Sequence, residues 1–185
     1  MKIECLQREN GRENREILAD FLRTMIAVTK YGRTTIYDGE LYYIPYTAVS
    51  YYVRETAERY DFIASEISED VSVYKRDEQN CLELRTLDVD EDYVLQGTRS
   101  SGALLEEVEK KIQLNKKMRK MFQKYHFELT EQKTIYLPEQ TFYGRGKKDT
   151  LFLVDGFLQK VDFKNLPSVE KRFAENFMKT QSLLS

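Results

Sequence analysis

The sequence predicts an α+β protein made of two small, tightly packed lobes. The chain has 185 residues, 41% of them hydrophobic, which is enough for one large core but not for two comfortable ones. Apolar residues recur at helical spacing in some segments, and β-rich runs flank Asp-Gly pairs in others. The stretch from 88 to 102 is first acidic and then small and polar. We therefore expect an N-terminal lobe at 1–97 and a C-terminal lobe at 98–185.

The N-terminal lobe opens with a strand and an amphipathic helix that ends at Tyr31-Gly32. Asp38-Gly39 is a residue pair favoured by two-residue hairpin turns, so a hairpin is expected there. Further along, the three-four spacing of Val49, Val53 and Tyr60 predicts a second helix. The expected elements are a strand at 2–6, a helix at about 12–30, a hairpin at 34–44, a helix at 49–60 and a hairpin at 71–87.

The order of these elements over 12–87 is that of a winged helix, with the turn at 77–80 as the tip of the wing. Its recognition segment, at 54–59, carries as many acids as bases, which disfavours contact with DNA phosphates. In this respect the N-terminal half resembles the small winged-helix subunits that attach to SMC-kleisin complexes. That resemblance implies contact with protein.

The C-terminal lobe begins with a long helix whose apolar stripe changes phase near Gln113. Either the helix breaks there, or its two halves pack against different partners. Asp155-Gly156 predicts the turn of a hairpin, and Pro167 opens a final amphipathic helix. The expected elements are a helix at about 103–125, strands at 134–137 and 141–143, a hairpin at 150–163 and a helix after 167.

Residue counts exclude several classes of site and of location. His126 is the single histidine, so zinc centres built from several histidines are excluded. Cys5 and Cys81 belong to no paired motif, and we expect reduced thiols in a cytoplasmic protein. No apolar stretch is long enough to span a bilayer and no secretory signal is visible, so no membrane contact is expected.

The charge is polarised, although the formal net charge is only -2. Ten acids lie between Glu66 and Asp92, whereas seven bases and no acid lie between Lys110 and Lys124. The second half of the long helix therefore predicts an exposed basic ridge that contacts nucleic-acid phosphates. Alternatively, the face is simply solvated, or it docks against the acidic lobe of the same chain or of a second copy in a homo-oligomer. The candidate nucleic-acid-binding residues are Lys116, Lys117, Lys120, Lys124, Arg145, Lys147 and Lys148.

One pattern predicts metal-dependent catalysis. Asp149, followed after twelve residues by Asp162-Phe163-Lys164, resembles the core of PD-(D/E)xK nucleases, including resolvase-like and viral cap-snatching endonucleases. The resemblance implies that Asp149 and Asp162 hold Mg²⁺ or Mn²⁺, that Lys164 supports the attacking water, and that Glu106 or Glu107 adds an acid. Alternatively, these residues are ordinary solvent-facing positions of a hairpin.

The tyrosine-rich segment around Tyr43 and Tyr46 offers a surface for a protein partner. Strand alternation sends neighbouring side chains to opposite faces, so one core cannot bury all of these rings. Exposed tyrosines are effective interface anchors. Alternatively, these rings are ordinary aromatic side chains on the faces of a sheet. The leading hypothesis is a non-enzymatic accessory protein without cofactors, which binds protein within a larger assembly and contacts the nucleic-acid backbone. The alternative hypothesis is the divalent-metal nuclease.

Overall fold

The computed structural model describes residues 1–7, 12–74 and 83–162, and more of these residues lie in strands than in helices. The predicted final helix falls in 163–185, outside the described residues. The elements are β1 (Lys2–Gln7), α1 (Asn14–Leu22), α2 (Met25–Tyr31), β2 (Thr35–Val53), β3 (Glu58–Ser65), β4 (Val71–Tyr74), β5 (Glu83–Asp88), the 3-10 helix η1 (Glu91–Tyr93), α3 (Ser101–Leu114), α4 (Lys116–Lys124), β6 (Phe127–Arg145), β7 (Thr150–Asp155) and β8 (Lys160–Asp162).

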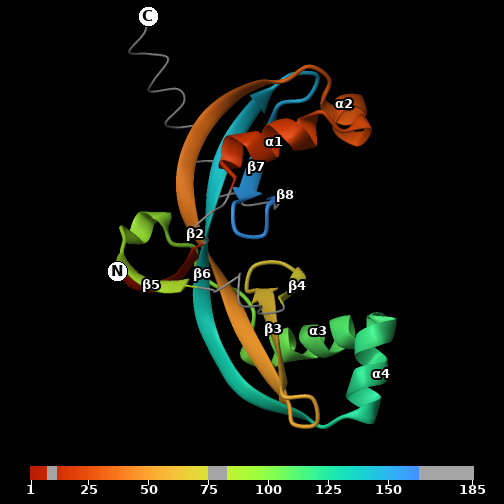
Figure 1. Cartoon of the computed structure of the whole chain (residues 1–185). Helices are drawn as coiled ribbons and strands as arrows, with labels where there is room; N and C mark the ends of the chain where they lie inside the picture. Colours follow the sequence, from red (N-terminus) through yellow and green to blue (C-terminus); the bar gives the residue numbers. More distant parts are fainter. Residues whose placement is uncertain (8–11, 75–82, 163–185) are drawn as a thin grey trace, which may run out of the picture. The chain divides into compact units, whose positions relative to one another are not determined.

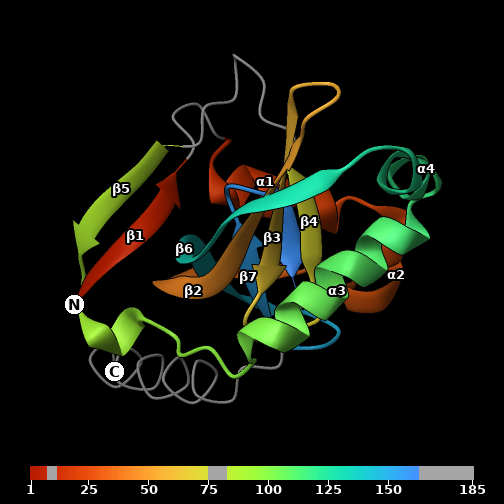
Figure 2. The same cartoon turned by 90° about the horizontal axis from the view of Figure 1, so that it is seen from below.

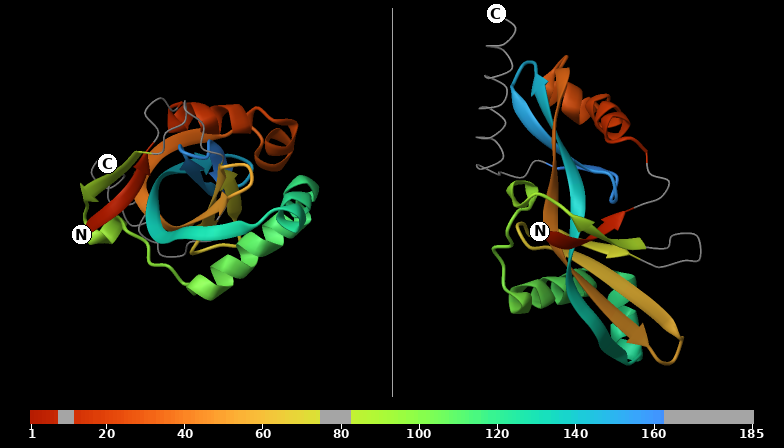
Figure 3. Two further views of the ribbon diagram at one scale, coloured as in Figure 1. Left: turned by 60° about the horizontal axis from the view of Figure 1, so that its bottom comes forward. Right: turned by 90° about the vertical axis from the view of Figure 1, so that its left-hand side faces the viewer.

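The strands form one mixed sheet with the order β4-β3-β2-β6-β1-β5, and β7 pairs with both β6 and β8. Figure 1 shows β2 and β6, both 19 residues long, running side by side. The β1–β5 pair is antiparallel, as the left view of Figure 3 shows, whereas β1 meets β6 in a parallel pairing at Cys5 and Tyr136. The described residues thus contain far more sheet than the sequence predicts.

The same order of elements occurs twice along the chain. Each series consists of two helices, a 19-residue strand and two shorter strands. The first series is α1-α2-β2-β3-β4 and the second is α3-α4-β6-β7-β8. The helices of each series pack on the short strands of the other, because α3 contacts β3 and β4 whereas α1 contacts β7 and β8. The two series are therefore interleaved.

The chain divides into two compact units, each of which takes residues from both sides of the expected boundary at 97. Unit 1 comprises 1–8 and 43–137, and unit 2 comprises 9–42 and 138–185. In unit 1, α3 lies against β3 and β4 (Figure 2). Its core joins sheet residues such as Val49 and Phe62 to Leu104 and Val108 of α3. In unit 2, the core packs Leu18 of α1 and Tyr31 of α2 against Phe152 and other sheet residues.

The winged-helix prediction is wrong, because the helix expected at 49–60 is instead the end of β2, a turn at 54–57 and the start of β3. Val49, Tyr51 and Val53 alternate on the buried face of β2, and Phe62 of β3 packs with them. Apolar side chains at 49 and 53 fit both a helical and an alternating pattern, and burial of this part of β2 against α3 selects the alternating one. The wing is also absent from the described residues: β4 pairs with β3 and β5 pairs with β1, so β4 and β5 form no hairpin.

The first Asp-Gly pair forms no turn. Asp38 and Gly39 lie inside β2, where a Cβ added to Gly39 would meet the Thr141 hydroxyl at 2.3 Å and the Thr141 carbonyl oxygen at 2.9 Å. The glycine is thus needed for close approach of the β6 backbone. Two helix predictions changed as well. The helix expected at 12–30 is broken at Thr24, which caps α2, and the long helix is broken at Asn115, near the predicted phase change.

Candidate functional site

Helix α4 of unit 1 carries a dense set of exposed basic side chains. Asn115 begins the helix by accepting hydrogen bonds from the backbone N–H groups of Lys117 and Met118, at 3.1 and 3.2 Å. Met118 is buried in the core with α3, and Phe122 packs partly buried beside it. This anchoring orients the remaining side chains outward. The basic face of α4 comprises the exposed residues Lys116, Lys117, Arg119, Lys120 and Lys124.

None of the five cations of the basic face forms an ion pair within the described part of the chain. Neighbouring bases of unit 1 are neutralised: Arg54 pairs with Glu128 at 2.8 Å, Arg59 with Glu131 at 2.6 Å, and Arg99 with Glu107. Lys124 instead lies over the ring of Tyr125, with 4.9 Å between Nζ and the ring centroid. The basic face therefore projects uncompensated positive charge into solvent.

Arg145, Lys147 and Lys148 belong to unit 2, and all three are exposed. Their loop lies beside the end of α2, where the Lys147 backbone N–H donates to the Tyr31 carbonyl at 3.0 Å. Helix α2 itself exposes three apolar side chains. Met25 is 83% exposed, Ile26 77% and Val28 52%. Unit 2 thus carries exposed apolar side chains in the first half of α2 and exposed basic side chains beside its last residue.

The residues of the nuclease pattern are separated in unit 2. Asp149 precedes β7, and its carboxylate accepts a 2.7 Å hydrogen bond from the Tyr143 hydroxyl. Asp162 pairs in register with Leu153, which lies four residues after Asp149 in the chain. At ~3.3 Å per residue this places the two backbones more than ~13 Å apart, too far for both carboxylates to bind one ion. Lys164 lies outside the described residues.

Glu106 and Glu107 lie in unit 1, where Glu107 is held by Arg99. Within 1–7, 12–74 and 83–162, no group of three or more histidine, cysteine, aspartate or glutamate residues is arranged to hold a metal ion. In the same ranges, no helix is long and apolar enough to cross a membrane. The arrangement of the described residues gives the nuclease alternative no support.

The two candidate interface tyrosines are not surface anchors. Tyr46 is only 1% exposed, and Tyr43 packs partly buried against the small core of Ile3, Cys5 and Val94. The strand alternation is as expected, but side chains on both faces of β2 are buried here, since all four residues at 44–47 are buried. Tyr46 therefore offers no exposed ring to a partner, and Tyr43 offers only part of one.

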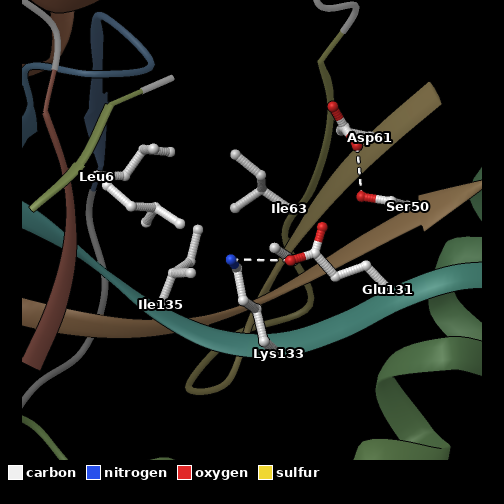
Figure 4. A pocket seen from close by; sticks show the side chains of 9 residues that line it. Leu6, Ser50, Asp61, Ile63, Glu131, Lys133 and Ile135 are labelled. Atoms are coloured by element: carbon white, nitrogen blue, oxygen red, sulfur yellow. Dashed lines mark hydrogen bonds and ion pairs between the residues drawn. The ribbon is translucent and has the colours of Figure 1, made fainter. Parts of the chain in front are cut away.

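A pit on the second face of the unit 1 sheet was not predicted from the sequence. Helix α3 covers the face that carries Val49 and Phe62, so the alternate residues of the same strands point to the other side. There the side chains line an open hollow (Figure 4). The pit is lined by Leu6, Ala48, Ser50, Asp61, Ile63, Leu84, Glu131, Lys133 and Ile135.

The polar side of the pit is a connected charge network. Glu131 accepts from Lys133 at 2.8 Å through one carboxylate oxygen and from Arg59 at 2.6 Å through the other. These two cations lower the pKa of Glu131, the hydrogen bond from Lys133 most strongly. Arg59 also reaches Asp61 at 3.3 Å, and the Ser50 hydroxyl donates to the same Asp61 oxygen. Five strands contribute to the lining, so no local motif could have revealed it.

Unit 2 buries a second pair of acids that the sequence did not single out. Glu139 of β6 and Asp155 of β7 are opposite one another in the sheet, and both are 0% exposed. One Asp155 oxygen accepts from the backbone N–H groups of Phe157 and Leu158, both at 2.9 Å. Burial, with the charge of Glu139, raises the pKa of Asp155 to about 7. The buried pair therefore lowers the stability of the folded protein by an amount that depends on pH.

Comparison of the chain with protein-family models, with curated proteins and with solved structures finds no match in any of the three.

Proposed function

We propose that the protein is a non-enzymatic binding protein whose basic face on α4 holds the phosphate backbone of a nucleic acid. The observation that carries the proposal is the set of five exposed cations on a helix of nine residues that form no ion pair with any residue the structure describes. The nearby arginines of the unit are neutralised by carboxylates, which leaves α4 as the place where a polyanion gains most from binding.

The arrangement of the cations favours phosphates over a protein surface. Lys116, Lys120 and Lys124 follow one another at intervals of four residues, which is a rise of ~6 Å along the helix. This spacing suits successive backbone contacts along a nucleic-acid strand. The exposed positions of α4 are lysine, arginine and glutamine. Lysine is depleted from protein interfaces, and such a face lacks the apolar centre that a protein partner needs.

A protein contact within a larger assembly is the second part of the proposal, and a different surface supports it. The three apolar side chains exposed on α2, Met25, Ile26 and Val28, are a suitable interface core. An accessory protein that joins a nucleic acid to a protein assembly needs two such surfaces of different chemistry.

Charge reversal tests the nucleic-acid part. We expect Lys116→Glu/Lys120→Glu/Lys124→Glu to abolish binding to a short duplex of arbitrary sequence, measured by fluorescence anisotropy over a salt series. In single reversals, the slope of log affinity against log salt should fall by about 1 for each lost phosphate contact. The matched control is Lys2→Glu/Lys30→Glu/Arg33→Glu, which makes the same change in net charge at exposed positions elsewhere.

Equal binding by wild type and the α4 triple variant contradicts the proposal, and so does equal loss in both triple variants, since net charge alone would then explain it. Native mass spectrometry of the protein isolated from its own host tests the protein part. A co-isolated protein should be lost from Met25→Ser/Ile26→Ser and kept by the α4 variant. The reverse pattern would place the protein contact on α4.

A further inference from the structure

We propose that the surface at the end of α4 selects single-stranded over double-stranded nucleic acid, with the ring of Tyr125 as a platform on which a base stacks. This preference rests on the proposed function and deepens it, because it names the form of nucleic acid that the basic face holds. Three observations carry it: a partly exposed ring next to the last cation of the face, a fixed backbone at this junction, and a carboxylate just beyond it.

The ring of Tyr125 lies beside the C-terminal end of the basic face. Tyr125 ends α4: its backbone is extended, and its N–H donates to the Met121 carbonyl at 2.9 Å. The Lys124 ammonium lies 4.9 Å from the centroid of the ring, which is within the range of a cation–π contact. This contact keeps the ring next to the last cation, while part of the ring stays exposed. A nucleotide whose phosphate is held by Lys124 therefore has an aromatic surface beside it for its base.

The backbone that follows Tyr125 is held in place on both sides of the junction. The backbone N–H of His126 donates to both carboxylate oxygens of Glu55, at 3.0 and 3.2 Å. One residue further, Phe127 stacks on Phe122 of α4, with 3.5 Å between the ring centroids. A ring on a backbone that is already ordered loses less conformational entropy when a ligand stacks on it.

The carboxylate of Glu55 disfavours a further phosphate beyond Tyr125. The hydrogen bonds from the backbone of His126 are the largest cause that lowers the pKa of Glu55, so this carboxylate is ionised at neutral pH. It repels a phosphate placed next to it, whereas it does not repel an uncharged base. The phosphate contacts therefore end with α4, and the part of the ligand that suits the junction is a base.

Stacking on a protein ring distinguishes the two forms of nucleic acid. In a duplex the faces of the bases are already stacked on one another, so Tyr125 gains little from them. Phosphate contacts alone would favour the duplex, which carries about one charge per 1.7 Å of its axis. A single strand exposes its bases, and stacking of one base on an aromatic side chain strengthens binding by about 10-fold. A preference for the single strand is thus the signature of the platform.

Three fluorescent ligands test this preference with the full chain. They are a thymidine strand of about 15 nucleotides, a duplex of the same length, and a strand of abasic sites with the same number of phosphates as the thymidine strand. The abasic strand keeps the phosphates but has no bases. At one low salt concentration, fluorescence anisotropy should show the thymidine strand bound at least ~10-fold more tightly than the abasic strand, and more tightly than the duplex.

Variants at the junction connect the preference to one ring. Tyr125→Leu should abolish the difference between the thymidine and abasic strands, because leucine is apolar but has no ring, whereas Tyr125→Phe should bind as wild type does. His126→Leu is the matched control: His126 is the adjacent exposed ring, and successive side chains of an extended backbone point to opposite sides. It should keep the preference. A thermal melt of each variant establishes that it is folded.

Equal affinity of wild type for the thymidine and abasic strands overturns the platform and leaves the proposed function standing, since the phosphates alone would then be bound. Tighter binding to the duplex than to the thymidine strand does the same. A folded Tyr125→Leu variant that keeps the preference, or a His126→Leu variant that loses it equally, overturns the role of Tyr125. Failure of all three ligands to bind wild type is a different result, which overturns the proposed function and the preference with it.

Discussion

Asp155→Asn should stabilise the protein above neutral pH and have little effect in acid. The pKa of Asp155 is raised from 3.8 to about 7, chiefly by burial. When the chain unfolds, the carboxyl returns to its ordinary pKa, so between these two values the folded state holds a proton that the unfolded state has lost. Stability then falls as pH rises. The difference between these two pKa values corresponds to ~4 kcal/mol of folding stability. This contribution is present in acid and fully lost above about pH 7.

The asparagine variant removes this cost while keeping the turn. Its side-chain oxygen still accepts from the N–H groups of Phe157 and Leu158, and its amide N–H group faces the acid of Glu139. The chain contains no tryptophan, so urea unfolding is followed by circular dichroism or tyrosine fluorescence at about pH 4 and about pH 8. The variant should gain up to ~4 kcal/mol over wild type at the higher pH and close to zero at the lower.

Asp149→Asn is the matched control, since Asp149 is an exposed aspartate just before the same strand. It should change the free energy of unfolding by less than ~0.5 kcal/mol at either pH. A gain from Asp155→Asn that is equal at both pH values would refute the argument from burial. A loss of stability at the higher pH would show that the ionised Asp155 is favourably paired in the folded protein.

Two further predictions follow from close packing and from burial. Gly39→Ala should destabilise unit 2 by ~1–3 kcal/mol in urea unfolding, because the new methyl group would overlap the Thr141 backbone; an unchanged midpoint would mean that β2 and β6 separate easily there. In a Cys81→Ser background, Cys5 should not react with an aromatic disulfide reagent until the protein unfolds, since burial raises its pKa to about 11 and covers its sulfur. Rapid labelling of the folded protein would contradict its place in the core.

The sequence by itself determined the local features that depend on neighbouring residues. Lysines spaced four apart on one helix and the phase change near Gln113 are local, and both appear in the structure as the basic face of α4 and the break at Asn115. Asp155-Gly156 likewise marks the turn after β7, as expected, because the Asp155 side chain bonds backbone groups two and three residues on.

Where a segment fitted both a helical and a strand pattern, only the tertiary structure decided which element formed. Residues 49–60 could be read as helix or strand, and burial of Val49 and Tyr51 against α3, more than 50 residues away in the chain, selects the strand. Gly39 lies in a strand for the same kind of reason, since Thr141 of β6 lies against it. The pit depends on five strands that meet in one sheet. Contacts between residues far apart in sequence leave no local signal, so the protein's charge was evident from its residues whereas the pit in its sheet was not.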